Sequence, residues 1–328
     1  MMDTQSDIVL HPQLTPPPST NHDAEADSDG EIEEQVAPIE PPQTVRVARP
    51  VPPHDYGPQA SIITVDQLLQ LALRPAPLNT RVACRIYRFR DGLEKIYPQY
   101  QLLIEHIPTG ELHHVLTAKK KRKSQTSYYT ITGGVHDPAT GQVKTNVELG
   151  KVRSNFLGTT FMIYSHGRNP MKKESNGSVK NDLPIREELG AVLYDPNILG
   201  FKGPRKMTIL MHTLTRDGKR PEFRPTSESE TLLSKYKDGG SSDLLVLHNK
   251  SPQWNEETQS FVLNFNGRVS QASVKNFQIV HDNDLDYIVM QFGRIGPDHF
   301  TMDYKYPMCL LQAFAIALTS FDAKLACE

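Results

Sequence analysis

Residues 304–328 read YKYPMCLLQAFAIALTSFDAKLACE, and this stretch decides the fold. No charged residue occurs between Lys305 and Asp322, and residues 308–321 are apolar around nearly the whole circumference of a helix. Such a helix is buried either in a large protein core or in a membrane. At about 1.5 Å per residue the apolar run spans roughly 21 Å, which is shorter than the ~30 Å hydrocarbon layer of a bilayer. The pattern therefore favours a core helix, and Pro307 suits its first position because proline lacks the N–H that has no partner there.

Upstream of this helix, short runs of β-branched and aromatic residues are separated by turn-forming clusters, with no alternation of strands and helices. Such runs predict an all-β barrel or sandwich. A buried helix that arrives last in the chain requires a closed barrel around it, and closure also leaves no exposed sheet edge. We expect strands at 82–89, 99–107, 111–118, 127–132, 147–153, 159–165, 188–194, 206–213, 244–248, 260–266, 277–280, 287–292 and 300–304.

Two helical segments are expected besides the C-terminal one. Thr64 and Gln67 have the spacing of a capping box, and the leucines that follow predict a short helix over 65–73, which Pro75 ends. The long polar stretch 216–243 is predicted to be a surface loop with one helical turn around 230–237.

The first 60 residues differ in composition from the rest. They contain 11 prolines and 11 acidic residues against two arginines, so this segment carries −9. The whole chain carries −2, so residues 61–328 carry +7. An acidic, proline-rich segment with few aromatics buries too little apolar surface to offset the entropy lost on ordering. We expect residues 1–60 to be disordered, serving either solubility or the binding of a partner.

The sequence contains no recognisable catalytic motif, since no phosphate-binding glycine loop, nucleophile elbow, kinase set or zinc-peptidase motif occurs. The three cysteines, Cys84, Cys309 and Cys327, are too few for a disulfide framework in a chain of this length. We therefore expect a protein that is not an enzyme and that needs neither a cofactor nor a metal.

No apolar segment typical of a secretory signal follows Met1, which predicts a cytosolic or nuclear location unless something tethers the protein.

Five consecutive cations, Lys119, Lys120, Lys121, Arg122 and Lys123, lie between two predicted strands. Such a block is typical of a solvated loop or of a nuclear localisation signal. Close to an anionic membrane each charge contributes about 1 kcal/mol of attraction, which fades as salt is added. The block can bring a protein to a surface, but it does not select a lipid.

A second basic group lies in GKVRSN at 150–155. If this segment is a strand, alternation places Lys151, Arg153 and Asn155 on one face and turns Val152 inward. An ammonium beside a planar guanidinium suits a phosphate group, because a point charge is paired with a two-pronged donor. An ordinary solvent-exposed face is the alternative interpretation.

Several longer runs resemble the carboxy-terminal domain of the Tubby and Tubby-like proteins. The resemblance extends from about residue 81 to the end and rests on LGFKGPRKM at 199–207, WNEETQSFVLNF at 254–265, GRVSQASVKNFQ at 267–278, YIVMQFGR at 287–294 and AFAIAL at 313–318. It implies a closed antiparallel barrel of twelve strands threaded by a hydrophobic helix. We accordingly divide the chain into the acidic segment 1–60, a short helix and linker at 61–80, and a phosphoinositide-binding domain at 81–328.

The resemblance also implies a binding site. Tubby-like domains bind phosphoinositides, particularly phosphatidylinositol 4,5-bisphosphate, through a Lys-x-Arg pair that falls on Lys151 and Arg153, with a further arginine that aligns with Arg186. One position departs from the family pattern, because Tyr128 stands where well-known members have asparagine. A tyrosine hydroxyl can still donate to a phosphate oxygen, but the side chain is larger. The block 119–123 is expected to add electrostatic support.

The function predicted from the resemblance is a phosphoinositide-binding adaptor at the inner face of the plasma membrane. The resemblance further implies delivery of membrane receptors to cilia with transport machinery, and passage to the nucleus as a transcription modulator. A nucleic-acid-binding regulator that uses the same cations is the alternative, although no groove-reading motif accompanies them. A protein scaffold with a vestigial lipid site is a third interpretation.

Overall fold

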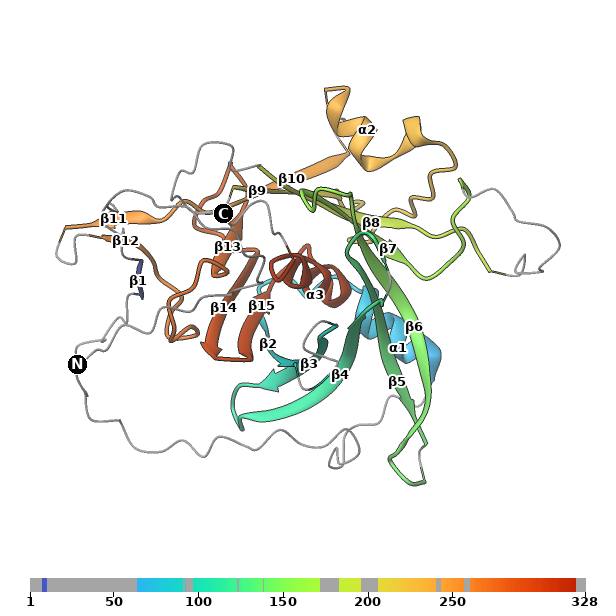
Figure 1. Cartoon of the computed structure of the whole chain (residues 1–328), viewed down its shortest axis with the longest axis horizontal. Helices are drawn as coiled ribbons and strands as arrows, with labels where there is room; N and C mark the ends of the chain where they lie inside the picture. The colour runs from blue at the N-terminus through green and yellow to red at the C-terminus, as the bar shows by residue number, and fades with distance from the viewer. Residues whose placement is uncertain are drawn as a thin grey trace, which may run out of the picture.

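The computed structural model describes residues 8–10, 64–90, 92, 97–122, 124–137, 139–171, 183–195, 206–239, 243–256 and 260–322. Within them, twelve antiparallel strands close into a barrel around helix α3 (Leu310–Thr319), which confirms the predicted fold class (Figure 1). In order around the barrel, the strands are β10 (Leu244–Asn249), β13 (Phe277–Val280), β14 (Met290–Gly296), β15 (His299–Tyr304), β2 (Val82–Phe89), β3 (Gln99–His106), β4 (Glu111–Lys120), β5 (Tyr128–His136), β6 (Val143–Ser154), β7 (Thr160–Ser165), β8 (Glu188–Tyr194) and β9 (Met207–His212).

Helix α3 fills the barrel, and every one of its residues is buried. Its few polar side chains are satisfied by the wall: the Gln312 amide donates to the Leu189 carbonyl (2.7 Å), and the Thr319 and Tyr194 hydroxyls lie 2.8 Å apart. The wall approaches closely at Gly150, where an added Cβ would lie 2.6 Å from the Tyr164 carbonyl oxygen and 3.1 Å from Leu311. Among the described residues, no helix has the length and apolarity needed to cross a bilayer.

The predicted role of Pro307 as the first helical residue is wrong. Helix α3 begins at Leu310, and Cys309 is its N-cap with extended backbone angles. The two residues before the helix are engaged elsewhere, because the Met308 carbonyl accepts from the Ala76 N–H (2.9 Å) and Cys309 forms a β-bridge with Pro75. Pairing with the 75–76 segment therefore holds these residues extended and delays the start of the helix.

Helix α1 (Val65–Leu73) has the predicted bounds, and the Thr64–Gln67 capping box is present. Its Leu68 and Ala72 side chains are fully buried, and the helix packs against α3, β5 and β6. Arg220 connects the two helices by donating to the Leu73 carbonyl (2.7 Å) and to the Cys309 sulfur (3.3 Å).

The remaining elements lie outside the barrel wall. The helical turn expected around 230–237 is present as a 3₁₀ turn, η2 (Glu228–Glu230), followed by α2 (Leu232–Lys237), which lies over β8 and β9. The predicted strand 260–266 is shorter than expected and is not a barrel strand. It is β12 (Ser260–Leu263), which pairs with β1 (Ile8–Leu10) and β11 (Gln253–Asn255). The strand ends because the Asn264 side chain accepts the Asn266 N–H (2.7 Å) in a turn.

The strand β1 falls within the segment 1–60 that we expected to be disordered, and the other residues of that segment lie outside the described ones.

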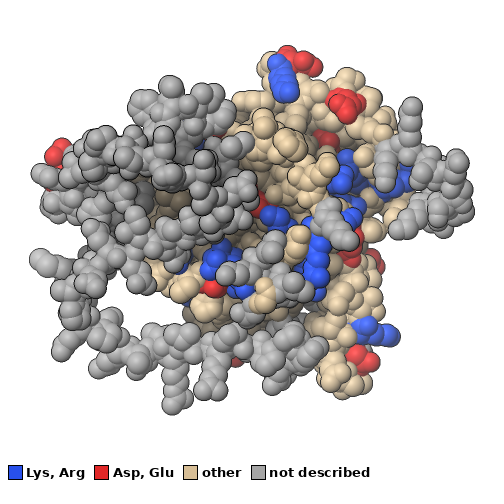
Figure 2. All heavy atoms as spheres, viewed as in Figure 1, with Lys and Arg blue, Asp and Glu red and all other residues tan. Residues whose placement is uncertain are grey.

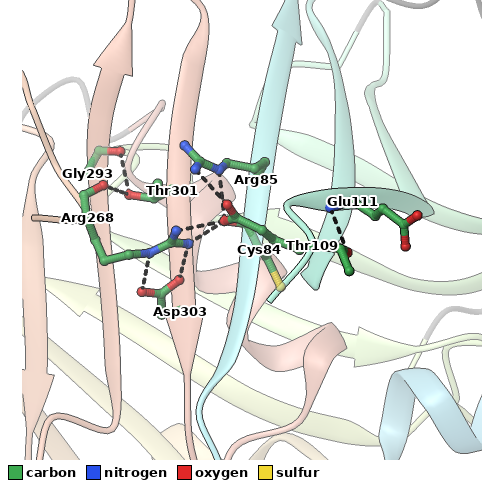
Figure 3. A network of polar contacts seen from close by, with 9 residues as sticks. Cys84, Arg85, Thr109, Glu111, Arg268, Gly293, Thr301 and Asp303 are labelled. Atoms are coloured by element: carbon green, nitrogen blue, oxygen red, sulfur yellow. Dashed lines mark hydrogen bonds and ion pairs between the residues drawn. The ribbon is translucent and has the colours of Figure 1, made fainter. Parts of the chain in front are cut away.

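A network of charged groups ties the segment after β12 to the barrel (Figure 3). Arg268 donates two hydrogen bonds to Asp303 (2.9 and 2.7 Å) and one to Glu105 (2.7 Å), and Arg85 donates two more to Glu105 (2.9 and 2.7 Å). The Arg268 and Asp303 side chains are almost fully buried, at 11 and 2 % exposure. Paired and hydrogen-bonded charges of this kind resist separation, since removing one partner leaves the other buried without compensation.

Candidate functional site

Strand β6 places Lys151 and Arg153 on the outside of the barrel. Val152, between them, is fully buried in the core, so the alternation predicted from the sequence is present. Asn155, which we expected on the same face, follows the end of β6 and lies in the turn after it. Its side-chain oxygen accepts hydrogen bonds from the Thr159 and Thr160 N–H groups (2.9 and 3.1 Å), so it is occupied within that turn.

Two rows of residues cross β4, β5 and β6 on this outer face. In the first row, Lys119 pairs with Thr130, which in turn pairs with Lys151. In the second row, the Lys121 N–H donates to the Tyr128 carbonyl (2.7 Å), and Tyr128 pairs with Arg153. Residues opposite one another in a sheet project to the same side, so the four cations form a grid.

We refer to Lys119, Lys121, Lys151 and Arg153 as the cationic grid. Strands are spaced about 4.8 Å apart and alternate residues about 6.6 Å apart, so the grid measures roughly 10 by 7 Å. Figure 2 shows that Lys and Arg side chains gather across the middle of one face of the molecule. An area of this size can present donors to two phosphate groups at once.

Tyr128 lies inside the grid and contacts two of its members. The ring centroid is 4.7 Å from the guanidinium carbon of Arg153 and 5.1 Å from the ammonium of Lys121. A cation over an aromatic face is attracted to it by about 0.5–1 kcal/mol when exposed. Tyr128 therefore holds two of the cations in place.

Arg186 reaches the same region from the segment before β8. Its guanidinium lies 3.6 Å from the centroid of the Tyr164 ring, and the residue is 9 % exposed. Burial lowers the pKa of Arg186; the positive charge of Arg153 lowers it further, while the Tyr164 side chain opposes the change. The guanidinium is thus largely removed from water, and a bound anion would favour its positive charge.

The backbone that carries Arg186 is fixed by Gly167. The Arg186 N–H donates to the Arg168 carbonyl (3.1 Å), and the Arg168 N–H donates to the Pro184 carbonyl (2.9 Å). Gly167 has a φ of +149°, and an added Cβ would lie 2.6 Å from the Pro184 oxygen and 2.7 Å from the Arg186 nitrogen. Only glycine permits these two segments to cross so closely.

Lys151 already has partners. Its ammonium donates to the Gly167 carbonyl (3.2 Å) and lies 3.3 Å from a carboxylate oxygen of Glu148. Glu148 is a third exposed, so this ion pair contributes little to stability and can be exchanged for a phosphate. The Gly167 contact matters more, because it joins Lys151 to the segment that carries Arg186.

The basic block is not the uniform support that the sequence suggested. Lys119 and Lys120 belong to β4, and the Lys120 ammonium is paired with Asp322 (2.7 Å), just after α3. Arg122 lies over the ring of Tyr97, 5.8 Å from its centroid, and Lys123 lies outside the described residues. Lys120 is therefore used to fix the end of the core helix, whereas Lys119 and Lys121 join the grid.

The structure thus brings Lys151, Arg153, Arg186 and Tyr128 into one region. It adds Tyr164, Gly167 and Glu148, which the sequence analysis missed. Glu148 could have been found as an acidic residue three positions before Lys151, but Tyr164 and Gly167 are recognised only once strand register is known. Chemically, the region offers cationic hydrogen-bond donors in fixed positions, which suits the recognition of a phosphorylated ligand.

Comparison with known proteins agrees with this fold. The family described as the Tub family matches residues 72–323, and the chain belongs to that family. It is 47 % identical to mouse Tubby-related protein 3 over 270 residues, covering 82 % of this chain and 57 % of that protein. It is 48 % identical to Protein king tubby 1 of Aedes aegypti over 265 residues, covering 80 % of this chain and 61 % of the relative.

Human Tubby-related protein 1 is 45 % identical over 267 residues, covering 81 % of this chain and 47 % of that protein. The chain thus spans about half to three-fifths of the length of these curated relatives. The resemblance noted in the sequence is confirmed at the level of the family.

Proposed function

We propose that the protein is a phosphoinositide-binding adaptor that attaches to the inner face of the plasma membrane. Its preferred ligand class is phosphatidylinositol 4,5-bisphosphate. The observation that carries the proposal is the position of Arg186 next to β6: its guanidinium lies 3.6 Å from the centroid of the Tyr164 ring, and Tyr164 on β7 pairs with Lys151. Lys151 and Arg153 project from the same face of β6, so three cationic side chains from two segments lie in one region. Like charges held together in a partly buried place are stabilised when a multivalent anion binds between them.

The cationic grid extends this anion site. Lys151 lies on β6 with Arg153, and Lys119 and Lys121, on and beside β4, add further donors across Thr130 and Tyr128. In a headgroup with two phosphates, one phosphate can bind the arginines and the other phosphate can bind the lysines. The arrangement therefore favours a bisphosphorylated inositide over a singly charged lipid.

Membership of the Tub family supports a wider role. In this role the barrel docks at the membrane and the protein carries membrane receptors towards the cilium with transport machinery, or leaves for the nucleus when the lipid is hydrolysed. Cytoplasm and inner plasma membrane are its main locations in this proposal.

Co-sedimentation of the full chain with vesicles tests the lipid site. Vesicles containing phosphatidylinositol 4,5-bisphosphate are compared with vesicles in which phosphatidylserine supplies the same total charge. Hydrogen bonds to charged groups contribute about 1.5–3 kcal/mol each, so Lys151→Ala with Arg153→Ala is expected to weaken bisphosphate binding at least ~100-fold. Lys219→Ala with Lys237→Ala removes two exposed charges from other segments and is the matched control, expected to bind as the wild type does.

Two results would contradict the proposal. One is bisphosphate binding that survives the double substitution at Lys151 and Arg153. The other is binding that follows total vesicle charge and disappears near physiological salt, since attraction without a specific site is screened. A duplex DNA probe, run at the same ionic strength, separates the lipid adaptor from a nucleic-acid-binding regulator.

A further inference from the structure

Two large apolar side chains are exposed at the tip of the β6–β7 hairpin. Phe156 is 80 % exposed and Leu157 is 56 % exposed. Single exposed apolar residues are common on protein surfaces. Here two of them are adjacent in sequence and form the central positions of one tight turn, so the tip presents a small apolar end.

The turn that carries them is held in one conformation. Gly158 has a φ of +69° and its N–H donates to the Asn155 carbonyl (3.3 Å), which closes a four-residue turn. The Asn155 side-chain oxygen accepts the N–H groups of Thr159 and Thr160, and its amide donates to the Thr159 hydroxyl (2.9 Å). Because these bonds fix the backbone, little further conformational entropy is lost when the tip is bound.

The apolar tip lies beside the cationic grid. Arg153 is three residues before Phe156, so at most about 10 Å of extended chain separates them. The Ser154 hydroxyl accepts the Ser127 N–H (2.9 Å) and donates to the Asn155 carbonyl (2.8 Å), which joins the base of the tip to the residue before Tyr128. Cations and apolar side chains therefore lie at the same edge of the barrel.

We propose that Phe156 and Leu157 insert into the acyl layer of an anionic membrane while the cationic grid and Arg186 hold a headgroup above it. This inference rests on the proposed lipid binding and adds a second contact to it. Apolar side chains at a membrane interface reach about 5–10 Å into the boundary between headgroups and acyl chains. That depth matches the distance that three residues can span beyond Arg153.

A lipid surface fits this edge better than a protein partner does. A bilayer places phosphates directly above hydrocarbon, in the order in which this edge places Arg153 and the apolar tip. Burial of the two side chains would supply attraction that added salt does not screen, whereas attraction to the grid weakens with salt. The tip would thus convert recognition of a headgroup into stable attachment.

The decisive experiment compares two ligands on the full chain. Phe156→Ser with Leu157→Ser is measured by co-sedimentation with vesicles of phosphatidylcholine and phosphatidylinositol 4,5-bisphosphate, and by calorimetry with soluble inositol 1,4,5-trisphosphate. We expect a ~10-fold or greater loss of vesicle affinity, since two apolar side chains no longer enter the lipid. Affinity for the soluble headgroup should stay within about twofold, because no side chain of the grid has been changed.

Leu78→Ser is the matched control. Leu78 is 68 % exposed, but it lies near the start of α3, where Ala76 bonds to Met308. Gly158 of the tip lies at the other end of that helix, facing the Asp322 carbonyl. We expect Leu78→Ser to bind vesicles as the wild type does.

Insertion itself is observed with Phe156→Trp. The chain contains one other tryptophan, Trp254, whose signal in the wild type supplies the background. On vesicle binding, the emission of the new tryptophan should shift to the blue, and lipids brominated on their acyl chains should quench it.

The outcomes separate the two proposals. If the double serine variant binds vesicles as tightly as the wild type does, or if it changes the oligomeric state of the protein and not its vesicle affinity, the insertion proposal is overturned and the headgroup site stands. If the wild type binds neither the bisphosphate vesicles nor the soluble headgroup, both proposals fail together.

Discussion

Arg153 and Tyr128 lie directly opposite one another on β6 and β5, with the guanidinium carbon 4.7 Å from the centroid of the phenol ring. The same ring lies 5.1 Å from the Lys121 ammonium. One aromatic side chain thus contacts two cations of the proposed lipid site. The family resemblance predicts asparagine at this position, and asparagine has no aromatic face on which cations can stack.

Tyr128→Asn is expected to change selectivity among inositol phosphates more than it changes overall affinity. Removing the ring releases Arg153 and Lys121 from their shared support, at about 0.5–1 kcal/mol for each contact, and adds an amide of shorter reach. We expect the ratio of Kd values for the 4,5-, 3,4- and 3,5-bisphosphates to change several-fold. The measurement is a panel of soluble inositol phosphates titrated into the full chain.

Tyr128→Phe separates the ring from its hydroxyl. If the hydroxyl donates to a phosphate, this variant loses about 1 kcal/mol, or roughly fivefold in Kd, while the stacking with Arg153 is kept. If both variants bind every inositol phosphate of the panel with the Kd values of the wild type, Tyr128 does not take part in recognition.

Arg268→Ala is expected to destabilise the protein by about 3–5 kcal/mol, because Asp303 and Glu105 then lose their shared cation in a buried place. Burial alone would raise the pKa of Glu105, but hydrogen bonds from Arg85 and Arg268 outweigh it and lower that pKa. Urea unfolding at neutral pH gives the free energy of unfolding. Binding of the soluble headgroup to the folded variant should be unchanged, since none of the network's residues belongs to the cationic grid.

Arg85→Ala is the control for this network. Arg85 is 27 % exposed, and in this variant Glu105 is still paired with Arg268. We therefore expect the free energy of unfolding to fall by only about 1 kcal/mol. Equal losses for the two arginines would contradict the view that Arg268 is the central member.

Much of the fold could be predicted from local sequence patterns, because the spacing of apolar residues depends on which side of a strand or helix is buried. The strand at 188–194 and the helix at 65–73 were predicted with their observed bounds. Period-two alternation and the capping box depend only on neighbours in sequence. The face shared by Lys151 and Arg153 could be predicted for the same reason.

Contacts between distant segments could not be predicted in this way. Lys120 appeared to be one of five equivalent cations, yet it pairs with Asp322, 202 residues further along. Pro307 had the right chemistry for a helix start, but the pairing of Cys309 with Pro75 moved that start to Leu310. In both cases a tertiary contact overrides a local preference. The ligand of the site stays a prediction.

His114 is expected to make the protein less stable as the pH falls from 6.5 to 4. Burial lowers the pKa of His114 from 6.5 to about 4. A hydrogen bond between His114 and the Leu116 backbone opposes the change, and the nearby His136 adds to it. The folded state therefore binds fewer protons than the unfolded state between these values, so the contribution of His114 is complete above pH 6.5 and is lost as the pH approaches 4. The loss is at most about 3 kcal/mol.

Urea unfolding at several pH values measures this dependence. His114→Gln, which can keep a hydrogen bond to the Thr117 hydroxyl, should flatten the curve between pH 6.5 and 4. His113→Gln is the neighbouring control: His113 is 39 % exposed, and its substitution should leave the curve as steep as in the wild type. Identical slopes for all three proteins would rule out the role assigned to His114.

Gly167→Ala is expected to weaken headgroup binding without a substitution at any charged residue. The new methyl group would lie within 2.7 Å of the Arg186 nitrogen, in a backbone conformation that favours glycine, so the segment before β8 has to move outward. Arg186 would then leave its place over Tyr164, and the Gly167 carbonyl would no longer position Lys151. We expect about a tenfold rise in Kd for soluble inositol 1,4,5-trisphosphate, with a loss of unfolding free energy of about 1–3 kcal/mol.

Gly141→Ala provides the comparison, because Gly141 also has a positive φ (+68°) but has open space around it and lies at the far end of the β5–β6 hairpin. It should lose some stability and keep its affinity. If both variants bind the headgroup equally well, the crossing of the two segments at Gly167 does not position the site.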